Sequence, residues 1–144
     1  MLKPKRTPKP KPTPAPLGHV LVVEDDTILS MALEDALLDA GAGSVEVVAS
    51  TAQALAALRD KRPDAVVLDV HLTDSDDGWE VAELASAAGP QPPRIIFSTG
   101  SPEEIPAKIA RMGAVLAKPY DPKDLIACLQ APQHRGLFSR LRGK

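Results

Sequence analysis

Reactive side chains stand where four short apolar runs of this chain end. The first of these ends carries two carboxylates, Glu24 and Asp25, and the next carries a third, Asp69. The last two carry a hydroxyl, Thr99, and an ammonium group, Lys118. If the runs are parallel strands of one sheet, their carboxyl ends lie along the same edge, where such sheets bind ligands. The spacing therefore predicts one site that combines three carboxylates with a hydroxyl and an ammonium group.

Carboxylates that share one edge of a sheet repel each other. At a separation of about 4 Å and an effective dielectric constant of about 20, the repulsion is about 4 kcal/mol. The acids must therefore take up protons, pair with Lys118 or bind a cation. A few oxygen ligands that leave positions open for water and phosphate suit Mg²⁺ better than Ca²⁺.

Such a cation and the neighbouring side chains could together support phosphoryl transfer. The cation would neutralise a phosphoryl group arriving at Asp69, while Thr99 and Lys118 would bind its oxygens. Asp69 is then a candidate nucleophile that forms an aspartyl phosphate. The alternative is that the acids only cap the helices that follow the strands, which we expect of Asp26 but not of the whole set.

The apolar runs have the composition of buried strands. They comprise residues 19–24, 44–49, 65–69, 94–99 and 114–117, and most are rich in Val, Ile and Leu on both faces. The second run has Glu46 at its centre, so we expect it at an edge of the sheet. Helical spacing and capping residues predict helices over 27–40, 51–61, 79–88, 103–112 and 121–130. The pattern predicts a doubly wound α/β fold: a five-stranded parallel sheet with helices on both faces.

Composition limits what kind of protein this is. The 144 residues are 44% hydrophobic and 25% charged, which is typical of one globular domain. No run is long enough for a membrane span, no signal peptide is visible, and the single Cys128 excludes an internal disulfide framework, so we expect a cytoplasmic protein. All nineteen carboxylates lie between Glu24 and Asp124, beside only eight basic residues. We therefore expect no direct DNA binding by the folded domain, and instead a cation or a basic partner.

The two ends of the chain differ from this acidic body. Residues 1–18 hold six prolines, five basic residues and no acid, which predicts a disordered, solvated leader. A contact with nucleic acid or anionic lipid, or a proline-motif ligand, are the alternatives. Residues 132–144 are also basic, and we expect a frayed tail there, with a membrane-surface or partner contact as the alternative. The folded domain is predicted over residues 19–131.

Four sequence motifs in this body resemble those of a known family. VLVVEDD ends at Asp26, PDAVVLDV contains Asp69, Thr99 is followed by Gly100, and AKPYDPKDL contains Lys118. In this order they resemble the CheY-like receiver domains of two-component response regulators, and the resemblance covers roughly residues 19–131. It implies a sheet of order 2-1-3-4-5 and phosphorylation of one aspartate by a histidine kinase or a histidine phosphotransfer protein.

The resemblance also implies roles for individual residues. Asp69 matches the phosphoacceptor, and Glu24 and Asp25 match the acid pair that holds Mg²⁺ together with Asp69. The backbone carbonyl of His71 would complete the protein's metal ligands. Thr99 and Lys118 match the hydroxyl and the ammonium group that contact the phosphoryl group. The Lys118–Pro119 bond resembles one that is typically cis in the family.

Some positions depart from the family pattern. The loop after Asp69 is one residue longer than usual, with Thr73 where proline is common, and Val115 replaces the aromatic switch residue. The short interval between Thr99 and Lys118 predicts an abbreviated fourth helix. Residues 97–101 resemble the FATGY-type variant of stand-alone receivers that lack the aromatic switch and act in phosphorelays. His71 and Ser101 flank the route of an attacking water and could tune the phosphoryl lifetime, and we expect Trp79 to anchor a helix.

The leading functional hypothesis is a single-domain response regulator, a monomer or weak dimer that signals by protein–protein contact. It is not expected to be an enzyme beyond phosphorylating itself and slowly losing the phosphoryl group. Residues after 131 are too few for an output domain, so we expect a downstream protein target. The alternative is a receiver-like interaction module that acts without phosphorylation. A phosphatase-type hydrolase is disfavoured, because His71 stands where such enzymes carry a second aspartate.

Overall fold

The fold is known from a computed structural model that describes residues 17–71 and 79–132. Its strands are β1 (His19–Val23), β2 (Ser44–Val48), β3 (Ala65–Asp69), β4 (Arg94–Thr99) and β5 (Ala114–Ala117). Its helices are α1 (Thr27–Asp39), α2 (Thr51–Asp60), α3 (Trp79–Ser86), α4 (Ala107–Ala110) and α5 (Pro122–Gln130), with a 3₁₀ turn, η1, at Pro102–Glu104. The expectations for Thr73, for leader residues 1–16 and for tail residues 133–144 lie outside the described residues.

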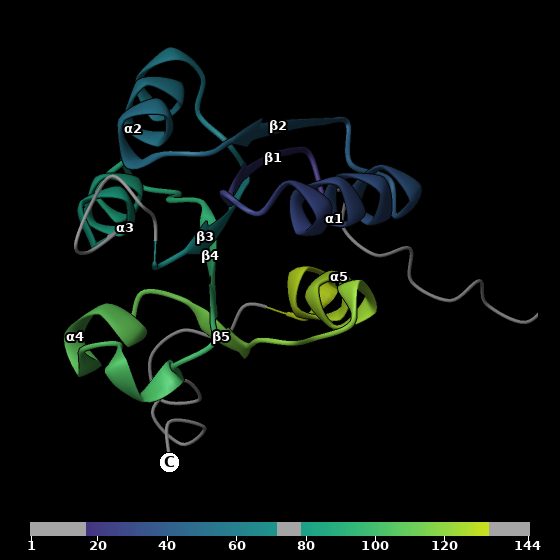
Figure 1. Ribbon diagram of the computed structural model, residues 1–144. Helices are drawn as coiled ribbons and strands as arrows, with labels where there is room; N and C mark the ends of the chain where they lie inside the picture. Colours follow the sequence, from purple (N-terminus) through teal and green to yellow (C-terminus); the bar gives the residue numbers. More distant parts are fainter. Residues whose placement is uncertain (1–16, 72–78, 133–144) are drawn as a thin grey trace, which may run out of the picture.

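The strands form one parallel sheet in the order β2-β1-β3-β4-β5, which confirms the predicted fold and order. β2 lies at an edge, as the glutamate at its centre predicted, and Glu46 is exposed there. In Figure 1, α1 and α5 lie on one side of the sheet, and α2 and α3 lie on the other. None of the helices in the described ranges is long and apolar enough to cross a membrane.

Both faces of the central strands are buried, which explains their unbroken apolar runs. Successive residues of a strand point to opposite faces, so Leu21 packs with the α2 and α3 side and Val22 with the α1 and α5 side. Every residue of β3 is buried, including Asp69 at its end. Leu17, just before β1, is also buried and packs with the α1 and α5 side.

Three helices begin after a residue whose side chain caps them, whereas Ser101, before η1, makes no such bond. Asp26, Ser50 and Asp121 cap α1, α2 and α5, and each accepts a hydrogen bond from a backbone N–H of the first turn. The expectation that Asp26 is a cap is therefore confirmed. Trp79 begins α3 and packs, partly buried, against the core, as expected of an anchor.

One predicted helix, over 103–112, is wrong as a continuous element. The segment instead forms η1, an extended Ile105, and the four-residue α4. Pro106 explains the break, because it lacks an N–H and forces the preceding residue out of the helical region; Ile105 has ψ 121°. The abbreviated fourth helix that the short Thr99–Lys118 interval predicted is thus present.

Candidate functional site

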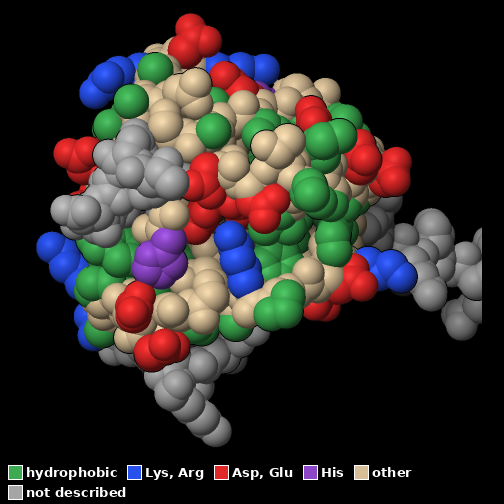
Figure 2. Space-filling model, viewed as in Figure 1, with side chains coloured by type: hydrophobic (Ala, Val, Ile, Leu, Met, Phe, Trp, Pro, Cys, Tyr) green, Lys and Arg blue, Asp and Glu red, His purple; other side chains and the backbone are tan. Residues whose placement is uncertain are grey.

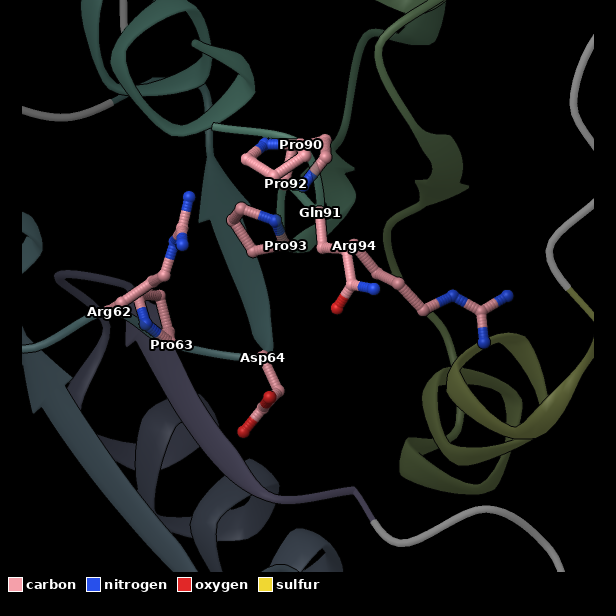
Figure 3. A pocket seen from close by; sticks show the side chains of 8 residues that line it. All are labelled: Arg62, Pro63, Asp64, Pro90, Gln91, Pro92, Pro93 and Arg94. Atoms are coloured by element: carbon pink, nitrogen blue, oxygen red, sulfur yellow. The ribbon is translucent and has the colours of Figure 1, made fainter. Parts of the chain in front are cut away.

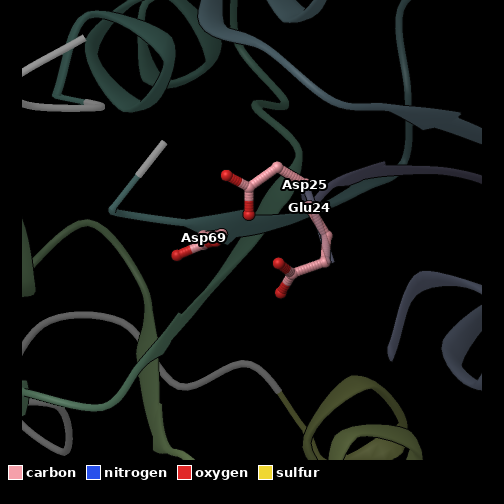
Figure 4. A group of neighbouring side chains, drawn as sticks. All are labelled: Glu24, Asp25 and Asp69. Carbon is pink, nitrogen blue, oxygen red and sulfur yellow. The ribbon is translucent and has the colours of Figure 1, made fainter. Parts of the chain in front are cut away.

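The three predicted carboxylates meet at the carboxyl ends of β1 and β3. Glu24 and Asp25 follow β1, Asp69 ends β3, and the two strands are direct neighbours in the sheet. One carboxylate oxygen from each residue lies within 4.8 Å of the other two, and the three side chains converge in Figure 4. Figure 2 shows acidic side chains gathered in the middle of this face, above a basic side chain.

Glu24 and Lys118 form the closest charged contact of this cluster. Lys118 Nζ donates to Glu24 Oε1 at 2.8 Å, and the Asp26 backbone N–H donates to the other Glu24 oxygen at 3.1 Å. Glu24 is only 3% exposed, whereas Asp25 is the most exposed of the three acids. The fold therefore holds Glu24 in place and leaves the Asp25 carboxylate open to solvent.

Asp69 is buried, and a backbone donor orients its carboxylate. Its Oδ1 accepts a hydrogen bond from the His71 backbone N–H at 3.0 Å. Its Oδ2 lies 3.6 Å from Lys118 Nζ, beyond a good hydrogen bond but within ion-pair range. The carboxylate is thus oriented by the backbone and still has an oxygen without a close donor among the described residues.

The charges of this cluster do not balance. Burial is the main reason that the pKa of Glu24 rises from 4.5 to about 7, and the nearby Asp69 charge adds to the rise. Burial alone would lower the pKa of Lys118, but the hydrogen bond that Lys118 donates to Glu24 and the charges of Asp69 and Glu24 raise it. Lys118 pairs with Glu24 and Asp69, and the Asp25 carboxylate lies within 4.8 Å of both acids, so a cation would relieve the remaining repulsion.

Thr99 lies at the end of β4, fully buried. Its Oγ1 accepts a hydrogen bond from the Ser101 backbone N–H at 2.9 Å, which leaves the hydroxyl hydrogen free to be donated. The Thr99 carbonyl accepts a hydrogen bond from the Lys118 N–H at 2.7 Å. This backbone bond joins the residue that carries the hydroxyl to the residue that carries the ammonium group. The Lys118–Pro119 peptide bond is cis, as the family resemblance implied.

His71 meets the site through its backbone, whereas its ring lies elsewhere. The ring Nε2 is 3.4 Å from Glu104 Oε2, and both side chains are about half exposed. The His71 backbone N–H donates to Asp69, and the role of the His71 carbonyl as a metal ligand stays a prediction. The contact with Glu104 was not predicted. The sequence pattern placed Glu104 in a helix over 103–112, whereas it ends the 3₁₀ turn η1.

A second pair of residues at this end of the sheet escaped the sequence analysis. Ser98 Oγ and Tyr120 Oη are 2.9 Å apart, and Ser98 is 1% exposed. Burial raises the pKa of Tyr120, and its hydrogen bond with Ser98 opposes that rise. The only signals were a serine before Thr99 and a tyrosine after Pro119, and neither is a recognisable motif alone. Val115, at the switch position, is 37% exposed on β5.

A pocket at the opposite end of the sheet offers no comparable chemistry. It is lined by residues of the loops before β3 and β4 and by the first residue of β4, among them Arg62, Asp64 and Arg94. In Figure 3 the two arginine side chains point away from each other. Asp64 accepts the His19 N–H at 2.8 Å, and Arg94 donates to the Leu129 carbonyl at 2.6 Å, so both groups already serve the fold.

Comparisons with known proteins agree with the geometry. Residues 20–130 match the family model of the response regulator receiver domain. The acid tolerance regulatory protein ActR of Sinorhizobium medicae is 33% identical over 140 residues, which cover 87% of this chain and 71% of ActR. The DNA-binding response regulator MtrA of Mycobacterium tuberculosis is 32% identical over 120 residues, which cover 81% of this chain but only about half (51%) of MtrA.

Among solved structures, the receiver domain of the sensor histidine kinase PA1611 from Pseudomonas aeruginosa superposes with a TM-score of 0.66 at 27% identity. The match covers 78% of this chain and 93% of that one. That structure holds a magnesium ion coordinated in its active site cleft.

Proposed function

Because the chain belongs to the response regulator receiver domain family of two-component signalling, we propose that it accepts a phosphoryl group on Asp69 in a Mg²⁺-dependent reaction. The observation that carries the proposal is the cluster of three carboxylates within 4.8 Å, two of them buried beside Lys118. A buried excess of negative charge lowers stability, so its presence at a ligand-binding edge favours a functional role.

In the proposed reaction, a carboxylate oxygen of Asp69 attacks the phosphorus of a phosphohistidine. A P–O bond forms, the P–N bond breaks, and the imidazole leaves with the bonding electron pair and takes up a proton. The hydrogen bond from His71 N–H to Oδ1 supports Oδ2 as the attacking atom, because no donor among the described residues lies as close to Oδ2. The product is an acyl phosphate on Asp69.

The donor set fits Mg²⁺, since it consists of hard oxygens and carries too much negative charge for Lys118 alone. Glu24, Asp25, Asp69 and the His71 carbonyl are the residues that we expect to hold the ion. When bound, it would offset the negative charge of the incoming phosphoryl group. The raised pKa of Glu24 means that protons compete with a metal for this site near neutral pH.

Thr99 and Lys118 are the proposed phosphoryl ligands. The Thr99 hydroxyl hydrogen is free, and its oxygen is already oriented by Ser101. Lys118 lies between Glu24 and Asp69, so its ammonium group can turn from the carboxylates toward a phosphoryl oxygen. The loop from β4 to η1, which begins after Thr99, would respond to the new charge on Asp69.

The phosphoryl donor is proposed to be a histidine kinase or a histidine phosphotransfer protein. Directly after the acidic residues, α1 exposes Ile28 (82%) and Met31 (60%) on successive turns. Large apolar side chains this exposed are typical of contact surfaces. A partner helix on this part of α1 would bring its phosphohistidine beside Asp25 and Asp69.

The proposed protein is a cytoplasmic monomer or weak dimer that works as a single domain. It is proposed to pass its signal on by contact with another protein. The concentration of carboxylates in the folded body supports a protein target over DNA, because phosphates would be repelled. The relatives with DNA-binding names are matched only in part, so their output is not carried over to this chain.

Phosphorylation-independent binding is the second candidate, favoured by the non-aromatic, exposed Val115 at the switch position. A partner pull-down would distinguish the two. Equal binding of wild type and Asp69→Ala, with and without Mg²⁺ and a phosphoryl donor, supports this candidate. Binding that needs the donor and Asp69 supports the phosphorylated regulator.

The proposed function is tested by intact mass after incubation with Mg²⁺ and acetyl phosphate. We expect wild type to gain one phosphoryl group, and Asp69→Ala, or wild type with a chelator, to gain none. Asp64→Asn is the matched control, since its carboxylate lies at the other end of the sheet. Equal gain by Asp69→Ala and wild type would refute Asp69 as the acceptor.

A further inference from the structure

Ser98 and Tyr120 lie at the point where the two proposed phosphoryl ligands are fixed. Ser98 directly precedes Thr99, and Tyr120 follows Lys118 by two residues. Ser98 also pairs with Asp69 across β3 and β4. Ser98 therefore places the hydrogen bond between the two hydroxyls one residue before Thr99 in β4. The same residue lies opposite Asp69, the proposed acceptor, in β3.

Two hydrogen bonds join the end of β4 to the segment after β5. The Lys118 N–H donates to the Thr99 carbonyl at 2.7 Å, and the Ser98 and Tyr120 hydroxyls are 2.9 Å apart. The first bond continues the sheet, whereas the second lies beyond the last residue of β5, where sheet pairing has ended. The side-chain bond thus extends the connection past the sheet.

The faces of β4 explain why this bond can position Thr99 without touching its hydroxyl. Phe97 packs on the α2 and α3 side, and Ile96 packs on the α1 and α5 side. By alternation, Ser98 points to the α1 and α5 side, where Tyr120 packs, and Thr99 points away from it. The hydrogen bond between Ser98 and Tyr120 therefore restrains β4 from the face opposite to the Thr99 side chain and does not occupy the Thr99 hydroxyl.

We propose that Ser98 and Tyr120 form a clamp that positions Thr99 and Lys118 for the phosphoryl group. The inference rests on the proposed function, since it assigns the two held residues to phosphoryl binding. Tyr120 is a positioning residue, because it acts through Ser98 and the backbone. It also precedes Asp121, the N-terminal cap of α5, so a displacement of Thr99 would reach α5 through the clamp.

The clamp can be separated from simple stability by a double variant. Tyr120→Phe leaves the buried Ser98 hydroxyl without its partner, Ser98→Ala leaves the part-buried Tyr120 hydroxyl without its partner, and either change should lower stability. Ser98→Ala with Tyr120→Phe removes both hydroxyls, so stability should recover while the clamp stays absent. Ser44→Ala is the matched control, because Ser44 Oγ and His19 Nδ1 form a similar bond, 2.7 Å long, at the opposite end of the sheet.

The first readout is the initial rate of phosphorylation by acetyl phosphate with Mg²⁺, measured beside the unfolding midpoint. We expect the double variant to be phosphorylated about tenfold more slowly than wild type, as small misplacements of reacting groups permit. Ser44→Ala should keep the wild-type rate. A double variant with the wild-type rate would overturn the clamp.

The second readout does not depend on phosphorylation. We expect the Thr99 methyl and Lys118 amide resonances to shift in the double variant and to stay in place in Ser44→Ala. If wild type gains no phosphoryl group, the proposed function fails, and these resonances alone decide the clamp. Unchanged resonances in the double variant would overturn it.

Discussion

The two ends of the sheet treat charge in opposite ways. At the amino ends of the strands, the Asp64 carboxylate accepts the His19 N–H, and Arg94 donates to the Leu129 carbonyl. At the carboxyl ends, Lys118 forms ion pairs with Glu24 and Asp69, and the Asp25 carboxylate lies within 4.8 Å of both acids. One end uses its charges to hold the fold together, whereas the other concentrates carboxylates that the fold does not neutralise.

This contrast shows that the carboxyl end of the sheet holds charge in an unfavourable environment. Glu24 is buried with its pKa raised to about 7, so its ionised form is disfavoured in the folded protein. A structural ion pair would be arranged to favour the ionised form instead. The carboxyl end is therefore destabilising without a cation, and changes there should have larger effects than matched changes at the amino end.

Removing Lys118 should have the largest effect. Lys118→Met leaves Glu24 and Asp69 without their ammonium partner, so the free energy of unfolding at pH 7 should fall by about 3 kcal/mol. That is the low end for a broken buried pair, because 26% of the Lys118 side chain is exposed. Urea denaturation measures it, with Lys108→Met, on an exposed residue of α4, as the control. Equal loss in both variants would contradict the comparison.

Mg²⁺ should stabilise the carboxyl end by a similar amount. At about one hundred times its dissociation constant, the ion should raise the free energy of unfolding by about 2.7 kcal/mol. Asp25→Asn should lose most of this gain, whereas Asp64→Asn should keep it. Thermal or urea unfolding with Mg²⁺ and with a chelator gives both values. A gain that survives in Asp25→Asn would place the ion elsewhere.

The pH dependence of stability should come partly from Glu24. Between pH 4.5 and about 7 the folded protein holds a proton on Glu24 that the unfolded chain has lost. Linkage then requires the free energy of unfolding to fall as pH rises through this window, by about 2 kcal/mol for this group. Glu24→Gln removes that contribution. Metal-free denaturation at pH 5 and pH 8 checks it, and parallel pH profiles for the two proteins would refute the assignment.

Matched changes at the amino end should be the smallest. Ser44→Ala removes the bond with His19 and should cost about 1 kcal/mol, the usual net value of such a hydrogen bond. Phosphorylation should be unaffected, because Ser44 lies at the far end of the sheet. Urea denaturation together with intact mass would show both results. A slower phosphoryl gain in Ser44→Ala would mean that the two ends are coupled.

The acidic site could be predicted because it depends on local patterns. Apolar runs with β-branched residues specify strands, and parallel strands bring their carboxyl ends together, so Glu24 and Lys118 meet despite a separation of 94 residues. The interruption of the fourth helix was not predicted. The sequence of 103–112 favours one continuous helix, but Pro106 breaks it. The Ser98–Tyr120 bond was missed for another reason: hydroxyls carry no periodic signal, and only packing decides which two will pair.

Chemical trapping tests, at the level of one residue, whether the carboxyl end of the sheet accepts a phosphoryl group at Asp69. Phosphorylated protein is treated with borohydride, which reduces an aspartyl phosphate to homoserine, and the peptides are sequenced by mass spectrometry. We predict homoserine at position 69, dependent on Mg²⁺ and absent without a donor. Homoserine at another aspartate, or none in protein that has gained a phosphoryl group, would contradict the claim.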